Sequence, residues 1–390
     1  DGVESSTNIS LIYKPIEKLT NKFTVANTYI ERIYARTPNS GNTQQDNYYG
    51  ERYAYLYQGN YNFNLDNSVV FGIEREDDQM GLNSNANGRV DSNAYVTSQF
   101  FDYQSRITNN IYGTIGARFD EHSLAGGTGS NENSHRATLA YVFDDKTTKL
   151  KSSYGTGYRF PSLYELKYVY RASSATLPFV KAETSQSYDF GIEKSISSNL
   201  FIDLTYFNVK YFDALEGWKT NTAGGSSSTQ NTIATVKSQG IELMSKYKLN
   251  ELFNFGLNYT YTSSYDGADE QNLSGPDSGS QMVRVPRNLV NLITNVKIPA
   301  YKDLDITLRT KWSDEARDYG NGNATSDKSP GFQNETLDSY LVNDLSVSYN
   351  YLNTYNLYFD VTNVFDKKYE TALQYSQMDR NFNFGIKKTY

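Results

Sequence analysis

Apolar and polar side chains alternate with a period of two in many short stretches of this chain. From Leu200 to Tyr206 the even-numbered positions are apolar, whereas Asp203 and Thr205 stand between them. A β-strand points successive side chains to opposite faces, so this pattern indicates strands with one apolar and one polar face. The same alternation recurs in residues 257–262, 306–312, 341–349 and 357–361. The chain is therefore predicted to be all-β.

The connections between the predicted strands alternate between short and long. The long ones are rich in Gly, Ser, Asn and Asp, which favour exposed turns, and they span Thr37–Asn47, Asp78–Val90, Ser123–Ser134, Pro161–Ala182, Ala214–Asn231, Ser264–Gln281, Ala316–Glu335 and Lys367–Arg380. A transmembrane barrel has this order, with short turns on the periplasmic side and longer loops outside. We therefore predict an antiparallel transmembrane β-barrel of about 17 strands, even though an even number is usual. A soluble β-sandwich or solenoid is the alternative.

The last predicted strand reaches the end of the chain. Residues 382–390 alternate and stop on the aromatic Tyr390. In a soluble domain such a strand would be a frayed edge, but in a closed barrel it pairs with another strand. If it runs toward the periplasm, the first strand, about Thr7–Lys14, runs the same way, which requires an odd number of strands. We therefore expect the chain to be the C-terminal portion of a larger barrel, unless a strand is miscounted.

Composition is compatible with a membrane barrel. The mean hydropathy of the 390 residues is −0.65, and no stretch is long and apolar enough for a spanning helix, whereas a spanning strand needs only about 9–11 residues. The 35 tyrosines and 20 phenylalanines suit aromatic girdles at the membrane surfaces. The net charge of −7 argues against nucleic-acid binding, the two histidines argue against a His-rich metal enzyme, and the absence of cysteine suits an oxidising compartment.

Five segments resemble motifs of the TonB-dependent outer-membrane receptors, in the order found in that family. They are Gly155–Leu166, Lys181–Glu193, Ser238–Leu243, Val285–Arg287 and Asn363–Glu370. Each motif alone is weak, but five in family order with similar spacing are specific together. Ala182 stands where the family usually has Pro. The glycines, prolines and turn residues of these motifs indicate barrel architecture rather than ligand contacts.

The resemblance implies a barrel of about 22 strands with an N-terminal plug domain inside it. We therefore expect residues 1–390 to be the C-terminal portion of a receptor β-barrel domain, with the plug and the first strands outside this sequence. The implied location is the cell outer membrane, as a multi-pass barrel. The implied partners are outer-membrane lipid, a small-molecule ligand and the TonB energy-transducing protein, which would act through the absent N-terminal region. No enzymatic activity, catalytic residue or nucleic-acid partner is expected.

The implied function is active transport of a scarce, bulky nutrient. Cobalamin (vitamin B12) is the best guess because Asn363–Tyr375 is most similar to vitamin B12 receptors, and a ferric siderophore or other metal chelate is the alternative. From another class, a passive porin or adhesin barrel fits the same strand pattern, as does a soluble β-scaffold.

Aromatic residues in the predicted outer loops are the candidate ligand contacts. They are Tyr48, Tyr49, Tyr168, Tyr170 and Tyr375. Their rings could stack on either a corrin or a catecholate, so they do not discriminate between the two ligand classes.

A calcium ion is the one possible cofactor. The resemblance to vitamin B12 receptors implies calcium in acidic outer loops, and Asp77, Asp78 and Asp91 offer the hard oxygen ligands it prefers. A solvated acidic loop is the competing interpretation. His122 and His135 flank another outer loop, but exposed histidines are more often incidental than ligand-binding.

Overall fold

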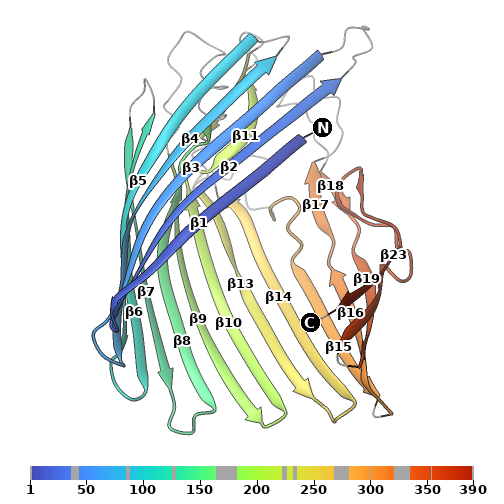
Figure 1. The fold of residues 1–390 in the computed structure, drawn as a ribbon. Helices are drawn as coiled ribbons and strands as arrows, with labels where there is room; N and C mark the ends of the chain where they lie inside the picture. Colours follow the sequence, from blue (N-terminus) through green and yellow to red (C-terminus); the bar gives the residue numbers. More distant parts are fainter. Residues whose placement is uncertain are drawn as a thin grey trace. The chain divides into compact units, whose positions relative to one another are not determined.

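Strands dominate the fold. The computed structural model describes residues 2–36, 44–84, 88–124, 129–163, 182–221, 226–231, 235–267, 281–298, 300–319, 334–352 and 354–388. Within them, 23 strands form one 17-stranded sheet and three two-stranded sheets (Figure 1). No helix in these ranges is both long and apolar enough to cross a membrane. The prediction of an all-β fold with about 17 main strands is confirmed.

Antiparallel neighbours in the large sheet follow one another along the chain, for example β1 with β2, β2 with β3 and β3 with β4. Frequent Val, Ile, Thr, Tyr and Phe at alternating positions favour this conformation. The strands are β1 (Gly2–Ile16), β2 (Leu19–Arg36), β3 (Gln44–Asn62), β4 (Asn67–Ser84), β5 (Gly88–Arg106), β6 (Ile111–Leu124), β7 (Ser130–Val142), β8 (Thr148–Arg159), β9 (Glu183–Ser197), β10 (Leu200–Phe212), β13 (Thr235–Lys248), β14 (Phe253–Gly267), β15 (Asn288–Ile298), β16 (Tyr301–Ser313), β19 (Tyr340–Tyr351), β20 (Tyr355–Thr362) and β23 (Asn381–Lys388).

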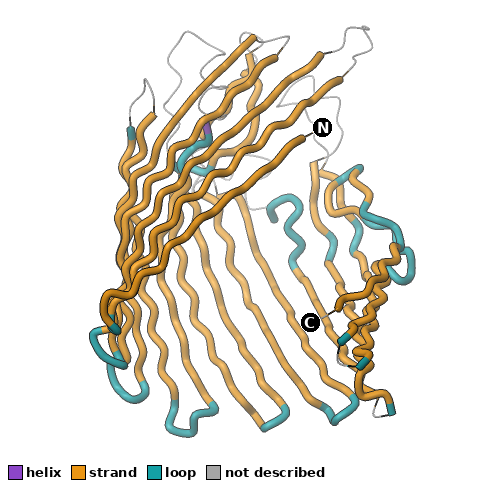
Figure 2. Tube along the Cα trace, in the orientation of Figure 1, coloured by secondary structure: helices purple, strands orange, loops and turns teal. Residues whose placement is uncertain are grey.

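Three of the predicted long connections contain small hairpins that the sequence did not reveal. These are β11 (Leu215–Asn221) with β12 (Ser226–Asn231), β17 (Ala316–Tyr319) with β18 (Asn334–Leu337), and β21 (Glu370–Ala372) with β22 (Tyr375–Ser376). Each is a two-stranded sheet separate from the large one. Figure 2 shows the strands in orange and the turns in teal.

The loop predicted at Asp78–Val90 is wrong in extent. Strands β4 and β5 run to Ser84 and from Gly88, and their register continues through Gly81 opposite Asp91. Strand β3 has 19 residues, or roughly 60 Å at about 3.3 Å per residue, far more than a tilted strand needs to cross a membrane. Beyond the membrane both faces meet water, so polar residues there do not end the strand.

The described residues cluster into two compact units. Unit 1 comprises Asp1–Leu139, Ser153–Gln186 and Tyr211–Ile233, and unit 2 comprises Ala140–Ser152, Ser187–Lys210 and Ala234–Tyr390. In unit 1, strands β3 to β6 have an apolar face on which Ile73 and Phe119 are 55% and 54% exposed. On the opposite face, which we call the network face, Ser98 and Asp120 are buried. Exposed apolar side chains suit lipid, so the network face is the polar side of the wall.

Aromatic rings lie over glycines of neighbouring strands. Phe100 faces Gly72, where an added Cβ would lie 2.5 Å from the ring, and Tyr49 covers Gly81 more closely still. The ring fills the space that a side chain would otherwise occupy, an arrangement that stabilises glycine within strands. The same holds for Phe71 over Gly59 and Tyr358 over Gly385.

Candidate functional site

A band of charged and polar side chains crosses the network face of unit 1. The register places Arg52 opposite Asp78, and Glu74 opposite Ser98, which in turn lies opposite Asp120. Side chains that are paired in this way share one face of the sheet. With their neighbours they form what we call the polar network: Arg52, Glu74, Glu76, Asp78, Ser98, Arg118, Asp120, His122 and Tyr158.

Arg118 is the centre of this network. Its Nη2 lies 2.8 Å from Oε2 of Glu74 and 2.7 Å from Oγ of Ser98, and its Nε lies 3.0 Å from Oδ1 of Asp120. The hydroxyls of Ser98 and Tyr158 also donate to the carboxylate of Asp120. Because the Asp120 side chain is only 2% exposed, these donors replace the water that a carboxylate requires.

A second guanidinium organises the other end of the network. Arg52 donates from Nε and Nη2 to the two carboxylate oxygens of Asp78, at 2.6 and 2.8 Å, and its Nη1 lies 3.6 Å from Glu76. The buried ring of His122 stacks on Phe160, with centroids 4.4 Å apart. Four carboxylates thus face two guanidiniums, so the network gives this face of the sheet an ordered polar surface with a net negative charge.

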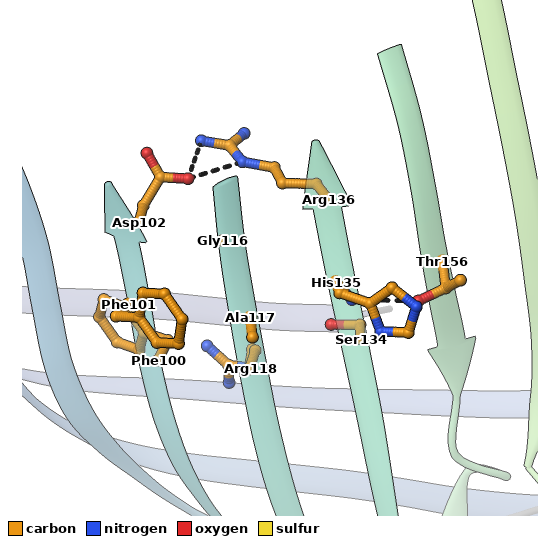
Figure 3. A pocket seen from close by; sticks show the side chains of 10 residues that line it. All are labelled: Phe100, Phe101, Asp102, Gly116, Ala117, Arg118, Ser134, His135, Arg136 and Thr156. Atoms are coloured by element: carbon orange, nitrogen blue, oxygen red, sulfur yellow. Dashed lines mark hydrogen bonds and ion pairs between the residues drawn. The ribbon is translucent and has the colours of Figure 1, made fainter. Parts of the chain in front are cut away.

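A cavity of about 310 Å³ adjoins this network between strands β5 and β8 (Figure 3). Arg136 holds Asp102 through Nε at 2.8 Å and Nη2 at 2.6 Å. This ion pair crosses Gly116, where an added Cβ would lie 2.7 Å from the carboxylate, so the missing side chain permits it. Phe100, Arg118 and His135 are among the other lining residues. The cavity is large enough for a small polar group and its water.

The structure separates the three predicted calcium ligands. Asp77 and Asp78 are neighbours on β4 and point to opposite faces, Asp77 binding Arg75 at 2.8 Å and Asp78 binding Arg52. Asp91 lies on β5 and binds Arg89 at 2.7 Å. Among the described residues, no three His, Cys, Asp or Glu side chains form a group suited to a metal ion. Calcium therefore stays a prediction, without a site in this part of the chain.

The predicted aromatic contacts are dispersed. Tyr48 and Tyr49 lie on β3, and the hydroxyl of Tyr49 donates to Asp91 at 2.5 Å on the apolar-face side of the sheet. Tyr375, on β22, is 69% exposed. Tyr168 and Tyr170 lie outside the described residues. Ligand binding by these tyrosines stays a prediction.

The sequence reasoning missed most of the polar network. His122 and His135 flank the connection between β6 and β7 as predicted, but His122 is buried in the network rather than exposed, and His135 lines the cavity. A usable signal was present, because Glu74, Glu76 and Asp78 repeat at a spacing of two, as strand residues on one face do. The pairing of these charges with Arg118 depends on strand register, which alternation alone does not give.

In unit 2 a buried carboxylate joins three long connections. Asp318, on β17, is fully buried; it accepts from Nε of Arg284 at 2.9 Å and from the backbone N–H of Leu373 at 2.6 Å. These groups come from the connections before β15, between β16 and β19, and after β20. We call Asp318, Arg284 and Leu373 the connection hub.

The Asn363–Glu370 motif organises the last of these connections. Asn363 has a positive φ of 52°, accepts from the N–H of Lys367 at 2.8 Å, and donates to the carbonyls of Lys367 and Met378. The backbone N–H of Arg380 donates to Asp366 and holds the pKa of that carboxyl below its usual value. The interpretation of this motif as architecture agrees with these contacts.

Comparison with known proteins gives a family model and solved structures. The model described as "TonB dependent receptor-like, beta-barrel" matches residues 4–364. The copper transporter OprC is 13% identical, with a TM-score of 0.79 over 99% of this chain and 66% of that chain. The pyoverdine outer membrane receptor FpvA from Pseudomonas aeruginosa PAO1 is 14% identical, with a TM-score of 0.77 over 100% of this chain and 62% of that chain.

A third solved structure is similar to the same extent. The siderophore receptor PirA from Acinetobacter baumannii is 16% identical, with a TM-score of 0.73 over 100% of this chain and 62% of that chain. At such identities the likeness concerns the fold. This chain spans about two thirds, or slightly less, of the length of these three proteins.

Proposed function

Because this chain belongs to the TonB-dependent receptor β-barrel family, we propose that it forms the barrel wall of a receptor for active uptake of a metal chelate. It is a β-barrel protein of the outer membrane. Both ferric siderophores and cobalamin are metal chelates, so the proposal keeps both ligand classes. Of the three similar structures described above, one is named for copper, one for pyoverdine and one for a siderophore.

The polar network carries this proposal. A wall that is apolar on one face and ion-paired on the other separates lipid from a polar interior. Because Arg118 and Arg52 fix the carboxylates around them, the network face presents donors and acceptors in fixed positions without collapsing onto itself. Such a surface suits passage of a bulky polar solute, and no bond of that solute needs to be made or broken.

The connection hub supports capture of a ligand outside the membrane. Long connections bind ligands best when a rigid scaffold positions them. Asp318 links two of these connections through its bond to the N–H of Leu373, and Asn363 orders the last connection through its bond to the carbonyl of Lys367. This order reduces the conformational entropy that is lost when a ligand binds.

Uptake by cells that carry the full-length gene is the decisive experiment. Cells with and without the gene, and with and without TonB, are given labelled ferric siderophores, cyanocobalamin and a copper complex. We expect uptake of one of these chelates only when both the gene and TonB are present. Entry of many small solutes without TonB would overturn the proposal in favour of a passive porin.

The same assay separates the ligand classes. Cobalamin uptake that weakens when calcium is chelated would assign the receptor to the vitamin B12 class and would also support the calcium prediction. Uptake of a ferric siderophore alone would keep the proposal and exclude cobalamin.

A further inference from the structure

We propose that the short connection between β3 and β4, residues 63–66, inserts Leu65 into the phospholipid headgroup region of the periplasmic leaflet. Short connections of outer-membrane barrels are usually polar turns in water. Here the Leu65 side chain is fully exposed and Phe63 is 47% exposed. An apolar side chain at a turn tip needs a partner that is apolar on one side and wet on the other, as a lipid interface is.

The turn that presents Leu65 is rigid. Asn64 accepts from the backbone N–H of Asp66 at 2.9 Å and from the side chain of Asn67 at 3.0 Å. The N–H of Phe63 donates to the carbonyl of Asn67 at 3.0 Å. With its backbone fixed by these bonds, the connection cannot fold Leu65 back onto the sheet.

The apolar face of the sheet continues into this turn. Phe63 packs edge-on against Tyr61 and Tyr103, with ring centroids 5.0 and 6.3 Å apart. Tyr103 and Tyr61 both pair with Val69, two residues from Phe71 on the same face. The lipid-facing surface therefore reaches the turn as a cluster of aromatic rings beside the polar Asn67 and Ser105. Aromatic residues of this kind mark membrane interfaces.

Charges around the turn also match a phospholipid surface. Lys18 donates from Nζ to the carbonyl of Phe63 at 3.0 Å, and Arg106 lies 3.5 Å from Asp66. Lys18 and Arg106 thus place two cations near the turn, where they can attract the phosphate groups of a phospholipid surface. In the next short connection, between β5 and β6, Ile107 is 59% exposed and extends the apolar tip.

A spin label at Leu65 tests the proposal. The chain contains no cysteine, so Leu65→Cys gives one reactive site once any cysteine elsewhere in the full-length receptor is replaced. Glu251→Cys is the matched control, because Glu251 occupies the short connection between β13 and β14 and its charged side chain is 87% exposed. The labelled receptor is studied in phospholipid vesicles and in native outer membranes, with oxygen as the lipid-soluble and a nickel chelate as the water-soluble relaxing agent.

We expect the ratio of oxygen relaxation to nickel-chelate relaxation to be several times higher at Leu65 than at Glu251. Equal, water-like accessibility at both positions would overturn the proposal. A label shielded from both agents in native membranes would also overturn it, since a protein would then cover the turn. Ile107→Cys gives a second site if Leu65→Cys does not fold.

Discussion

Replacement of Asp318 by alanine should release the connection after β20 while leaving the sheet intact. In the wild-type structure the carboxylate of Asp318 is fully buried and binds Arg284 and the N–H of Leu373. Alanine removes both bonds and leaves the N–H of Leu373 without this acceptor. The large sheet is stabilised by its own ladders, so the effect should be confined to the connection hub.

The size of this effect follows from burial. A buried donor that loses its acceptor costs about 1–3 kcal/mol. The Arg284 side chain is 50% exposed, so its ion pair is screened by solvent and adds about 1 kcal/mol. The total of about 2–4 kcal/mol corresponds to a rise of about 30- to 700-fold in the local opening equilibrium.

Hydrogen exchange measures that equilibrium directly. Peptides covering residues 363–380 are followed by mass spectrometry in the wild type and in Asp318→Ala, in the same detergent. We expect these peptides to exchange faster in the variant by the factor above, while peptides from β19 and β20 keep their rates.

Asp379→Ala is the control. Asp379 pairs with Lys368 in the same connection, but its side chain is 65% exposed, so its loss should cost less than about 1 kcal/mol. Unchanged exchange of residues 363–380 in Asp318→Ala, or equal changes in the two variants, would refute the role of the buried carboxylate.

Three further predictions concern the strands and turns. Gly240→Ala should strongly lower the urea midpoint of unfolding, because the added Cβ would overlap a carbonyl oxygen of β14. Gly256→Ala should be tolerated, because the nearest atom to its added Cβ lies at 3.8 Å. Equal unfolding midpoints of the two variants, measured by heat-modifiable gel mobility, would contradict this. Arg118→Ala leaves the buried Asp120 without its guanidinium and should cost about 2–3 kcal/mol in urea unfolding; a loss below about 0.5 kcal/mol would count against the network. Backbone N–H donors hold the pKa of Asp145 below its usual value. Its stabilisation is therefore present above about pH 4 and is lost as the pH falls through the lowered folded-state pKa. Asp145→Asn should then have a lower free energy of unfolding than the wild type at pH 7. This difference should shrink in strong acid, and a difference that is the same at both pH values would contradict the prediction.

The main strands could be predicted because each one carries its own signal. Alternation at Leu200–Tyr206 or Leu357–Val361 is local, and both segments lie in strands. The prediction failed where that signal weakens. The polar composition of Asp78–Val90 predicts a loop, but β4 and β5 extend through most of it. Polar composition indicates water around a segment and does not distinguish a loop from a strand that projects beyond the membrane.

The candidate site was less predictable because its contacts join distant parts of the chain. Arg118 and Glu74 are 44 residues apart, and Leu373 and Asp318 are 55 apart. Those pairings follow from register and from the path of the connections, neither of which is readable from residue type. Tyr49 shows the same limit, since an apparent loop aromatic turns out to cover Gly81 within the sheet.

The pairing of aromatic rings with glycines has a consequence for how the barrel selects its alignment. In–out alternation has a period of two, so a strand that slides by two residues keeps every apolar side chain facing lipid. Such a slide would leave Phe100 without Gly72 and Tyr49 without Gly81, and the rings would meet ordinary side chains instead. The ring–glycine pairs therefore disfavour two-residue register shifts, which the burial of apolar side chains alone does not disfavour. During assembly they would fix the register of each hairpin relative to the next. That register sets the tilt of the strands and hence the width of the lumen.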